Sequence, residues 1–288
     1  MIKYRALRLP KKLPRKYKNS VFKLVNWICG SLVIVATFFV FGYILYHGAL
    51  NINWDFISDR PRGIPIGTEG GVFPAITGTI YLGAMAGLIA GLVGSLTAIY
   101  LVFYCRNKYT RGVIKTSIYF LSGMSSILFG LVGYTILLHI LGLPRSLLVA
   151  GITVATMISP FITIRIIKVF EEDSSETLHA SLCLGLPKTY ILAKLILPNY
   201  YIGILTSITL GVAYGMGAAA PVMLTGAVLN APTPQSVTQP FMSLSYHLFI
   251  LVSEGVSLTN AYASAFLLVL ILLILNITCR GLEYLRKR

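Results

Sequence analysis

The chain has 288 residues; 56% of them are aliphatic, aromatic or Cys, and only 11% are charged. With a mean hydropathy of +0.79, this composition excludes an ordinary soluble globular domain. The formal net charge is +15. Because the basic residues lie beside apolar runs and form no basic face on a soluble fold, membrane topology and anionic lipids account for this charge, and nucleic-acid binding does not.

Apolar runs long enough to cross about 30 Å of hydrocarbon recur along the chain. They lie near 23–46, 76–103, 116–141, 147–169, 199–225 and 261–279. The sequence therefore predicts an all-α, polytopic membrane protein with six transmembrane helices. A basic arm at 1–22 precedes the six-span domain at 23–281, and a basic tail at 282–288 follows it. The first run has no small-residue cleavage pattern, so we expect a retained span and not a signal peptide.

Basic residues also predict the orientation of the spans. They are concentrated in the N-terminal arm, in the loop at 104–115 and in the tail, whereas the opposite loops offer only Arg60, Arg62 and Arg145. Because excess Lys and Arg mark the cytoplasmic side, we expect both termini in the cytoplasm and the chain in the inner (plasma) membrane.

On the external side, the segment at about 226–260 contains His247 and Glu254. Two interpretations stay open: they contact an anion-loaded binding protein, or they are simply solvated, as most polar residues in such loops are.

A polar segment at about 171–198 separates the fourth and fifth apolar runs. Asp173 or Ser174 is expected to cap a short helix there, with Glu176 in its first turn. Gly185 suits the left-handed position that ends a helix, and Pro187 suits the first turn of the next helix. The sequence thus predicts a cytoplasmic helix–turn–helix with a smooth surface, a shape that fits a groove on another protein.

The same segment resembles the coupling motif of bacterial ABC importer permeases, which reads EAA, three residues, G, nine residues, I-x-L-P. Here His179 replaces the usual Glu, and Pro198 ends the motif with every spacing kept. Pro198 is expected where the chain re-enters the membrane, because a missing N–H costs least at a helix start. The resemblance implies that an ATPase subunit docks on Glu176, His179, Ala180, Ser181, Gly185 and Pro198.

Three further segments resemble permeases of the PstA type, one of the two permease subunits of the bacterial phosphate importer. They are GGVFPAITGTIYL at 70–82, SGMSSILFGLVGY at 122–134 and the run from ILPNYY to MLTGA at 196–227. The resemblance implies a type I ABC permease fold, a phosphate substrate and no cofactor. It also implies four partners: a second homologous permease, two cytoplasmic ATPase subunits and an extracytoplasmic phosphate-binding protein.

Four charged positions of that family have become uncharged in this chain. The family has Arg or Glu where this sequence has Ile164, Ile167, Tyr214 and Ala218. A phosphate ion among apolar helices needs charge-assisted donors, so two explanations stay open. Either the paired permease supplies the cations, or this subunit has changed its oxyanion or lost strict coupling. In the first case this chain lines the pathway with Ser125, Ser126, Tyr214 and Pro221.

Other functional classes fit the sequence less well. A permease for molybdate or tungstate would explain the missing charges. An ion-coupled secondary transporter would need ionisable groups within its spans, and this chain has almost none. A structural scaffold would not need the coupling spacing. No GxxxxGK[ST], HExxH or GxSxG motif occurs, so we predict no enzymatic activity, and ATP hydrolysis is expected from a partner.

Overall fold

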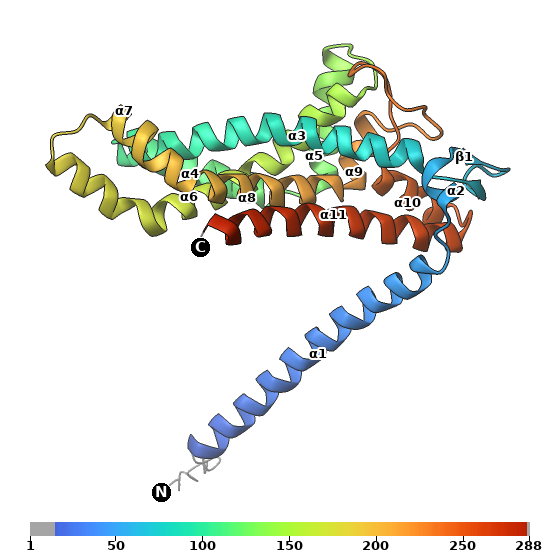
Figure 1. Cartoon of the computed structure of the whole chain (residues 1–288), viewed down its shortest axis with the longest axis horizontal. Coiled ribbons are helices and arrows are strands. Elements are labelled where there is room, and N and C mark those ends of the chain that lie inside the picture. The colour runs from blue at the N-terminus through green and yellow to red at the C-terminus, as the bar shows by residue number, and fades with distance from the viewer. Residues whose placement is uncertain (1–14, 287–288) are drawn as a thin grey trace, which may run out of the picture. The chain divides into compact units, whose positions relative to one another are not determined.

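The computed structural model describes residues 15–286, with the side chains of residues 22–171 and 180–281. Most of the predicted arm at 1–22, and the side chains of the tail at 282–288, lie outside the described residues. The chain divides into two compact units, residues 1–46 and 47–288. The helices and strands, in chain order, are α1 (Arg15–Ala49), α2 (Trp54–Ser58), β1 (Pro61–Arg62), β2 (Glu69–Gly70), α3 (Phe73–Ile99), η1 (Tyr100–Tyr104), α4 (Lys108–Ser122), α5 (Ser126–Gly133), η2 (Tyr134–Ile140), α6 (Leu147–Cys183), α7 (Lys188–Tyr190), η3 (Ile191–Ile196), α8 (Leu197–Met216), α9 (Ala219–Thr225), α10 (Leu244–Ser253) and α11 (Leu258–Arg286), where η marks π-helical turns (Figure 1).

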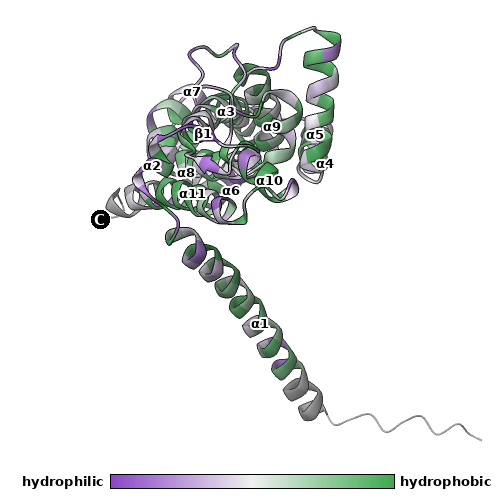
Figure 2. Cartoon of the chain, turned by 90° about the vertical axis from the view of Figure 1, so that its right-hand side faces the viewer, coloured by the Kyte–Doolittle hydropathy of each residue, from purple (hydrophilic) through white to green (hydrophobic). Residues whose placement is uncertain are grey.

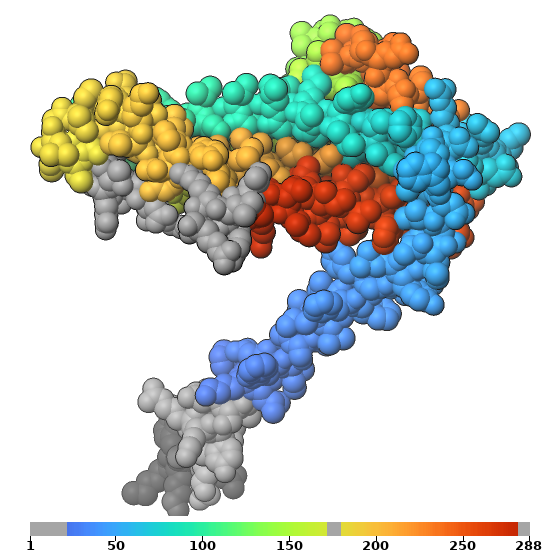
Figure 3. Space-filling model, viewed as in Figure 1, coloured from blue at the N-terminus to red at the C-terminus, as the bar shows by residue number. Residues whose placement is uncertain are grey.

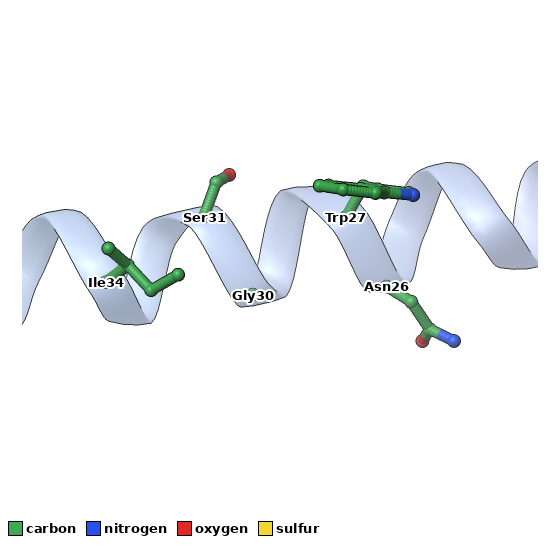
Figure 4. Close-up of a pocket in the computed structure, with 5 residues that line it drawn as sticks. All are labelled: Asn26, Trp27, Gly30, Ser31 and Ile34. Atoms are coloured by element: carbon green, nitrogen blue, oxygen red, sulfur yellow. The ribbon is translucent and has the colours of Figure 1, made fainter.

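The first unit consists of most of α1. Residues Phe22–Ala49 are long and apolar enough to cross a membrane; at 1.5 Å per residue they span about 42 Å. Figure 2 shows α1 hydrophobic over most of this length. Figure 4 shows a shallow notch on its surface where Gly30 lacks a side chain. Trp27 beside this notch is 79% exposed, so the notch is a surface feature and not an enclosed site.

The second unit is built on three helices, α3, α6 and α8, which pack against one another. Along α6, Ile158, Ile162 and Ile166 are fully buried. Gly94 of α3 and Gly211 of α8 both face Ile162, and at position 211 its side chain leaves no room for a Cβ atom. Small residues therefore let the three helices approach closely, as they commonly do between membrane helices.

Most expected spans correspond to helices of sufficient length, but two of them are broken. Among the described residues, five helices are long and apolar enough to be spans: Phe22–Ala49, Phe73–Tyr104, Leu147–Glu171, Lys188–Met216 and Leu258–Gly281. The expected span at 116–141 is a bent pair, because α4 and α5 meet at 101°. The expected span at 199–225 has different bounds: the helix begins at Lys188 and ends at Met216, and Ala218 is extended before α9.

The short helices that follow these two breaks, α5 and α9, pack on each other. Gly130 of α5 lies against the backbone of α9, where a Cβ atom would approach Pro221 Cα at 2.8 Å and Ala220 O at 3.2 Å. Within α9, Thr225 Oγ1 donates to Pro221 O at 2.6 Å. Close packing thus fixes the helices that follow the breaks, whereas Gly123, Ser125 and Gly217 at the breaks themselves are exposed.

Opposite ends of the second unit differ in structure. At one end, here called the hairpin end, β1 and β2 pair antiparallel, with Pro61 opposite Gly70, next to α2 and α10 (Figure 1). Asn260 Nδ2 donates to Gly67 O at 2.8 Å and to Thr68 O at 3.0 Å, which ties the hairpin to α11. The other end carries α7 and the chain reversal before it.

We predict that Gly130→Ala destabilises the protein by about 1–3 kcal/mol, because the new methyl group meets backbone atoms that cannot rotate away. Gly123→Ala, in the same broken span, is the matched control, since its Cβ would lie no closer than 3.5 Å to Phe120 O. Thermal unfolding of both variants in detergent tests this difference. Equal unfolding temperatures would show that α5 and α9 do not pack this closely.

Candidate coupling segment and translocation pathway

The polar segment after the fourth apolar run continues the helix that crosses the membrane. Helix α6 runs without interruption from Leu147 to Cys183, a length of about 55 Å. Its N-cap is Ser146, whose Oγ accepts from Val149 N at 3.4 Å. The prediction that Asp173 or Ser174 starts a separate helix is therefore wrong. A side chain of that type caps a helix only where the backbone before it leaves the helical conformation, and here the backbone does not.

A proline inside α6 does not break the helix. Pro160 has no N–H, so the carbonyl of Thr156 loses its usual partner one turn earlier. The hydroxyl of Ser159 donates to Thr156 O at 3.1 Å and takes its place. This local bond helps α6 to remain continuous through its buried middle.

Helix α6 ends in a tight turn built on Gly185, as the sequence predicts. The φ of Gly185 is +76°, the left-handed conformation. Leu186 N donates to Ser181 O at 3.3 Å, and Gly185 N donates to Leu182 O at 3.0 Å. This pair of bonds is the Schellman pattern, which satisfies carbonyls at a helix C-terminus. We call residues 180–187 the coupling turn.

The chain that follows the coupling turn differs from the prediction at Pro187 and agrees with it at Pro198. Pro187 has extended backbone and precedes α7, so it caps that helix and is not in its first turn. Pro198 lies in the first turn of α8, as expected, although the helical path already begins at Lys188 and runs through η3. Pro198 falls where the π-helical turns of η3 give way to α8.

The segment that follows the coupling turn, α7 and η3, packs against the helix bundle. Ile191 and Ile196 are fully buried, as is Phe170 of α6. The Phe170 ring lies 5.2 Å from Phe103 and 6.4 Å from Tyr200, both in edge-to-face geometry. The ring contacts hold η1, α6 and α8 together below the turn, and the buried Ile191 and Ile196 anchor η3.

The coupling turn itself is exposed. Figure 3 shows this segment, in yellow, at the extremity of the second unit opposite the hairpin end. Leu184, at the tip, is 79% exposed, and Cys183 and Gly185 beside it are exposed as well. Leu184 was not singled out from the sequence, although a large apolar residue directly before the predicted turn glycine was a usable signal. A rigid base with an exposed apolar tip suits contact with another protein.

The predicted coupling residues occupy different environments. Ala180 and Gly185 are exposed, and Ser181 is buried. The backbone of Glu176 and His179 lies in α6, but their side chains lie outside the described residues.

The predicted pathway residues cluster at the breaks. Ser125 is exposed at the bend between α4 and α5, and Ser126, half-buried, begins α5. Pro221 is buried in α9 against Gly130, so its side chain contributes to packing.

Tyr214 belongs to an exposed line of aromatic and basic side chains. Its ring is 53% exposed and lies 5.9 Å from the ring of Phe161 on α6. The guanidinium carbon of Arg165 lies 5.6 Å from the centre of the same Phe161 ring. The structure therefore brings Arg165 and Tyr214 to one face of α6 and α8, which the sequence did not predict.

His247 fits neither interpretation of the sequence, an external contact or a solvated residue, because its side chain is only 2% exposed. It lies in α10, a 10-residue helix too short to span a membrane, and Leu251 on the same helix is fully buried. Its Nδ1 has no hydrogen-bond partner among the described residues. Burial lowers the pKa of His247 from 6.5 to about 4, since desolvation disfavours the charged form. Glu254, by contrast, is exposed.

Helices crossing the bilayer, broken spans and an exposed turn on a long helix define a membrane permease of the ABC importer class. The chain belongs to the family of binding-protein-dependent transport system inner membrane components, whose family model matches residues 83–285. It is a multi-pass inner-membrane transporter subunit and not an enzyme.

Among individual proteins, the chain is similar to the phosphate transport system permease protein PstA 2 of Mycobacterium bovis. The two are 26% identical over 279 residues, which cover 94% of this chain and 91% of that protein. The probable ABC transporter permease protein YqgI of Bacillus subtilis is 21% identical over 287 residues, with 93% and 96% covered.

Solved structures share the fold. A chain of the inward-facing MetNI methionine ABC transporter gives a TM-score of 0.61 at 16% identity, covering 72% of this chain and 92% of that one. A chain of a bacterial alginate ABC transporter, in complex with an alginate-bound periplasmic protein, gives 0.62 at 14% identity, covering 94% and 97%.

We predict that acid destabilises the hairpin end through His247. Above pH 6.5 the residue is neutral in both the folded and the unfolded state and has no effect. As the pH falls from 6.5 towards 4, the unfolded state takes up a proton that the folded state does not, so stability is lost. The full difference corresponds to about 3 kcal/mol.

Thermal unfolding between pH 7.5 and pH 4.5 tests this prediction, with His247→Gln removing the titrating group. His139→Gln is the control, because His139 is exposed. An unchanged pH dependence in His247→Gln would contradict the assignment.

Proposed function

We propose that this chain is one of two permease subunits of an ATP-driven phosphate importer, and that its coupling turn docks on a cytoplasmic ATPase subunit. Membership of the permease family and the similarity to PstA proteins over 94% of the chain support this proposal. The single observation that carries the coupling role is the exposed Leu184 on a rigid turn that forms the end of α6. The chain has no P-loop, so a partner must bind the nucleotide.

A single helix, α6, connects the coupling turn to the helices at the proposed pathway. Helix α6 packs against α5 and α9, the helices that follow the two breaks, and it ends in the coupling turn. A displacement of the turn by the ATPase would therefore move one continuous helix against both broken spans. Rigid-body movement of packed helices is a common way to switch between two states.

The distribution of charge supports cytoplasmic termini. Lys108, Arg111 and Lys115 begin α4, on the side of the coupling turn, while Arg60 and Arg62 lie at the hairpin end. The excess of basic residues beside the turn agrees with a cytoplasmic location for it. The hairpin end then faces the external binding protein.

In this proposal the pathway runs past the breaks in the third and fifth expected spans, where Ser125, Ser126 and Tyr214 offer hydroxyl groups. Pro221 acts by holding α9 in place. The second permease supplies the cations that replace the hydration shell of phosphate. A permease for another oxyanion, molybdate or tungstate, is the second candidate, and the uncharged Ile164, Ile167, Tyr214 and Ala218 favour it.

We expect Cys183 to cross-link to the ATPase subunit, because this native cysteine is the last residue of α6 and is exposed. The assembled complex is treated with a short bifunctional thiol reagent after replacement of the other cysteines, and products are identified by mass spectrometry. Glu254→Cys, exposed at the hairpin end, provides a matched control in the same background. Cross-linking from position 254 and not from Cys183 would reverse the proposed orientation.

We expect Gly185→Asp to reduce ATP-dependent phosphate uptake by more than about tenfold, because it places a charge in the docking surface. Gly185→Asn is the isosteric control: Asn tolerates the left-handed conformation of Gly185 and adds no charge. Uptake of radiolabelled phosphate is measured in proteoliposomes that contain the whole complex, with molybdate as competitor. Strong competition by molybdate, or no phosphate uptake by a complex that hydrolyses ATP, would favour the second candidate.

A further inference from the structure

A small cavity lies between α4 and α6 on the side of the coupling turn. Its volume is about 70 Å³, more than twice the roughly 30 Å³ that a water molecule occupies in the liquid. Ile118, Ile164 and Ile167 form its apolar lining. Ile118 and Ile167 are buried, so this lining belongs to the helix packing.

The polar part of the lining carries more positive than negative charge. Lys115, Lys168 and Tyr119 line the cavity together with Glu171. Lys115 Nζ lies 3.1 Å from Glu171 Oε1, and Arg111 Nη2 lies 3.4 Å from the same oxygen. The Glu171 carboxylate thus pairs with two cations, and Lys168 adds a further cation to the lining. The Lys115 side chain is 31% exposed, so this charge is partly shielded from solvent.

This combination fits a tetrahedral oxyanion. Ammonium groups and a phenol are hydrogen-bond donors, and an ionised acceptor strengthens such bonds. We propose that the cavity binds a phosphoryl oxyanion through Lys115, Tyr119 and Lys168, while Glu171 holds Lys115 in position. The oxyanion is either inorganic phosphate, which rests on the proposed function, or the phosphate of an anionic lipid headgroup, which does not.

The position of the cavity on α6 agrees with this proposal. Ile164 and Ile167 are the positions at which the resemblance to phosphate permeases predicts Arg and Glu. Lys168 and Glu171 follow them by four residues, on the same helix face and one turn nearer the coupling turn. The order of cation and carboxylate and their spacing are kept, so the charged pair is displaced along α6 and is not lost.

Binding by the purified full-length chain tests the proposal without a transport assay. The protein is held in a maltoside detergent, which carries no phosphoryl group. Equilibrium dialysis measures radiolabelled inorganic phosphate, and native mass spectrometry measures phosphatidylglycerol. The test variant is Lys115→Gln with Lys168→Gln, and the charge-matched control is Lys108→Gln with Arg165→Gln, because Lys108 and Arg165 are exposed on the same two helices and do not line the cavity.

We expect the test variant to bind at least one of the two probes about tenfold more weakly, and the control to change by less than about twofold. Lys115→Arg with Lys168→Arg should retain binding, which separates lost charge from misfolding. A loss confined to inorganic phosphate identifies the substrate ion as the ligand, and a loss confined to phosphatidylglycerol identifies the lipid. Binding of neither probe by the wild type, or equal losses in the test and control variants, would overturn the proposal. Failure of phosphate uptake with intact binding would instead contradict the proposed function.

Discussion

The structure depends on one constraint: a backbone N–H or C=O group in hydrocarbon must find its partner within the protein. Helix α6 meets this constraint over its whole length, with the Ser159 hydroxyl bonded to the carbonyl that Pro160 leaves free. At the two breaks, part of the backbone is satisfied by the helix ends, where Gly123 N donates to Tyr119 O and Gly217 N donates to Ala213 O. The break residues Ser125 and Gly217 are exposed on this chain, and the pathway is proposed at that place.

Because α6 is continuous, the coupling turn is mechanically part of a transmembrane helix. The carbonyls at its end are satisfied by the turn itself, through Leu186 and Gly185. Below the turn, Phe170, Ile191 and Ile196 are fully buried and fix the returning chain. The turn, with Leu184 at its tip, is exposed and available to another protein. This division between a fixed base and an exposed tip is what a connection between two subunits requires.

The ion pairs among the described residues lie in two places. Within the described residues, the ion pairs are those of Asp59 with Arg62 in the hairpin and of Glu171 with Arg111 and Lys115 near the coupling turn. The middle of the bundle relies on hydroxyl groups and small residues. An importer of anions built this way needs cations from elsewhere, either from the second permease or from the cavity between α4 and α6.

Local properties of the sequence were sufficient to identify the apolar runs, the basic clusters beside them and the spacing of the coupling motif, and to predict the turn at Gly185. The left-handed Gly185 is predictable because only a few neighbouring residues determine a helix end. The 101° bend after Ser122, the burial of His247 and the bond of Lys115 to Glu171 were not predictable. Hydropathy sums transfer free energies along the chain and carries no information on the direction of the backbone. A contact such as that of Lys115 with Glu171, 56 residues apart, exists only after the helices have packed, so the tertiary structure alone decided it.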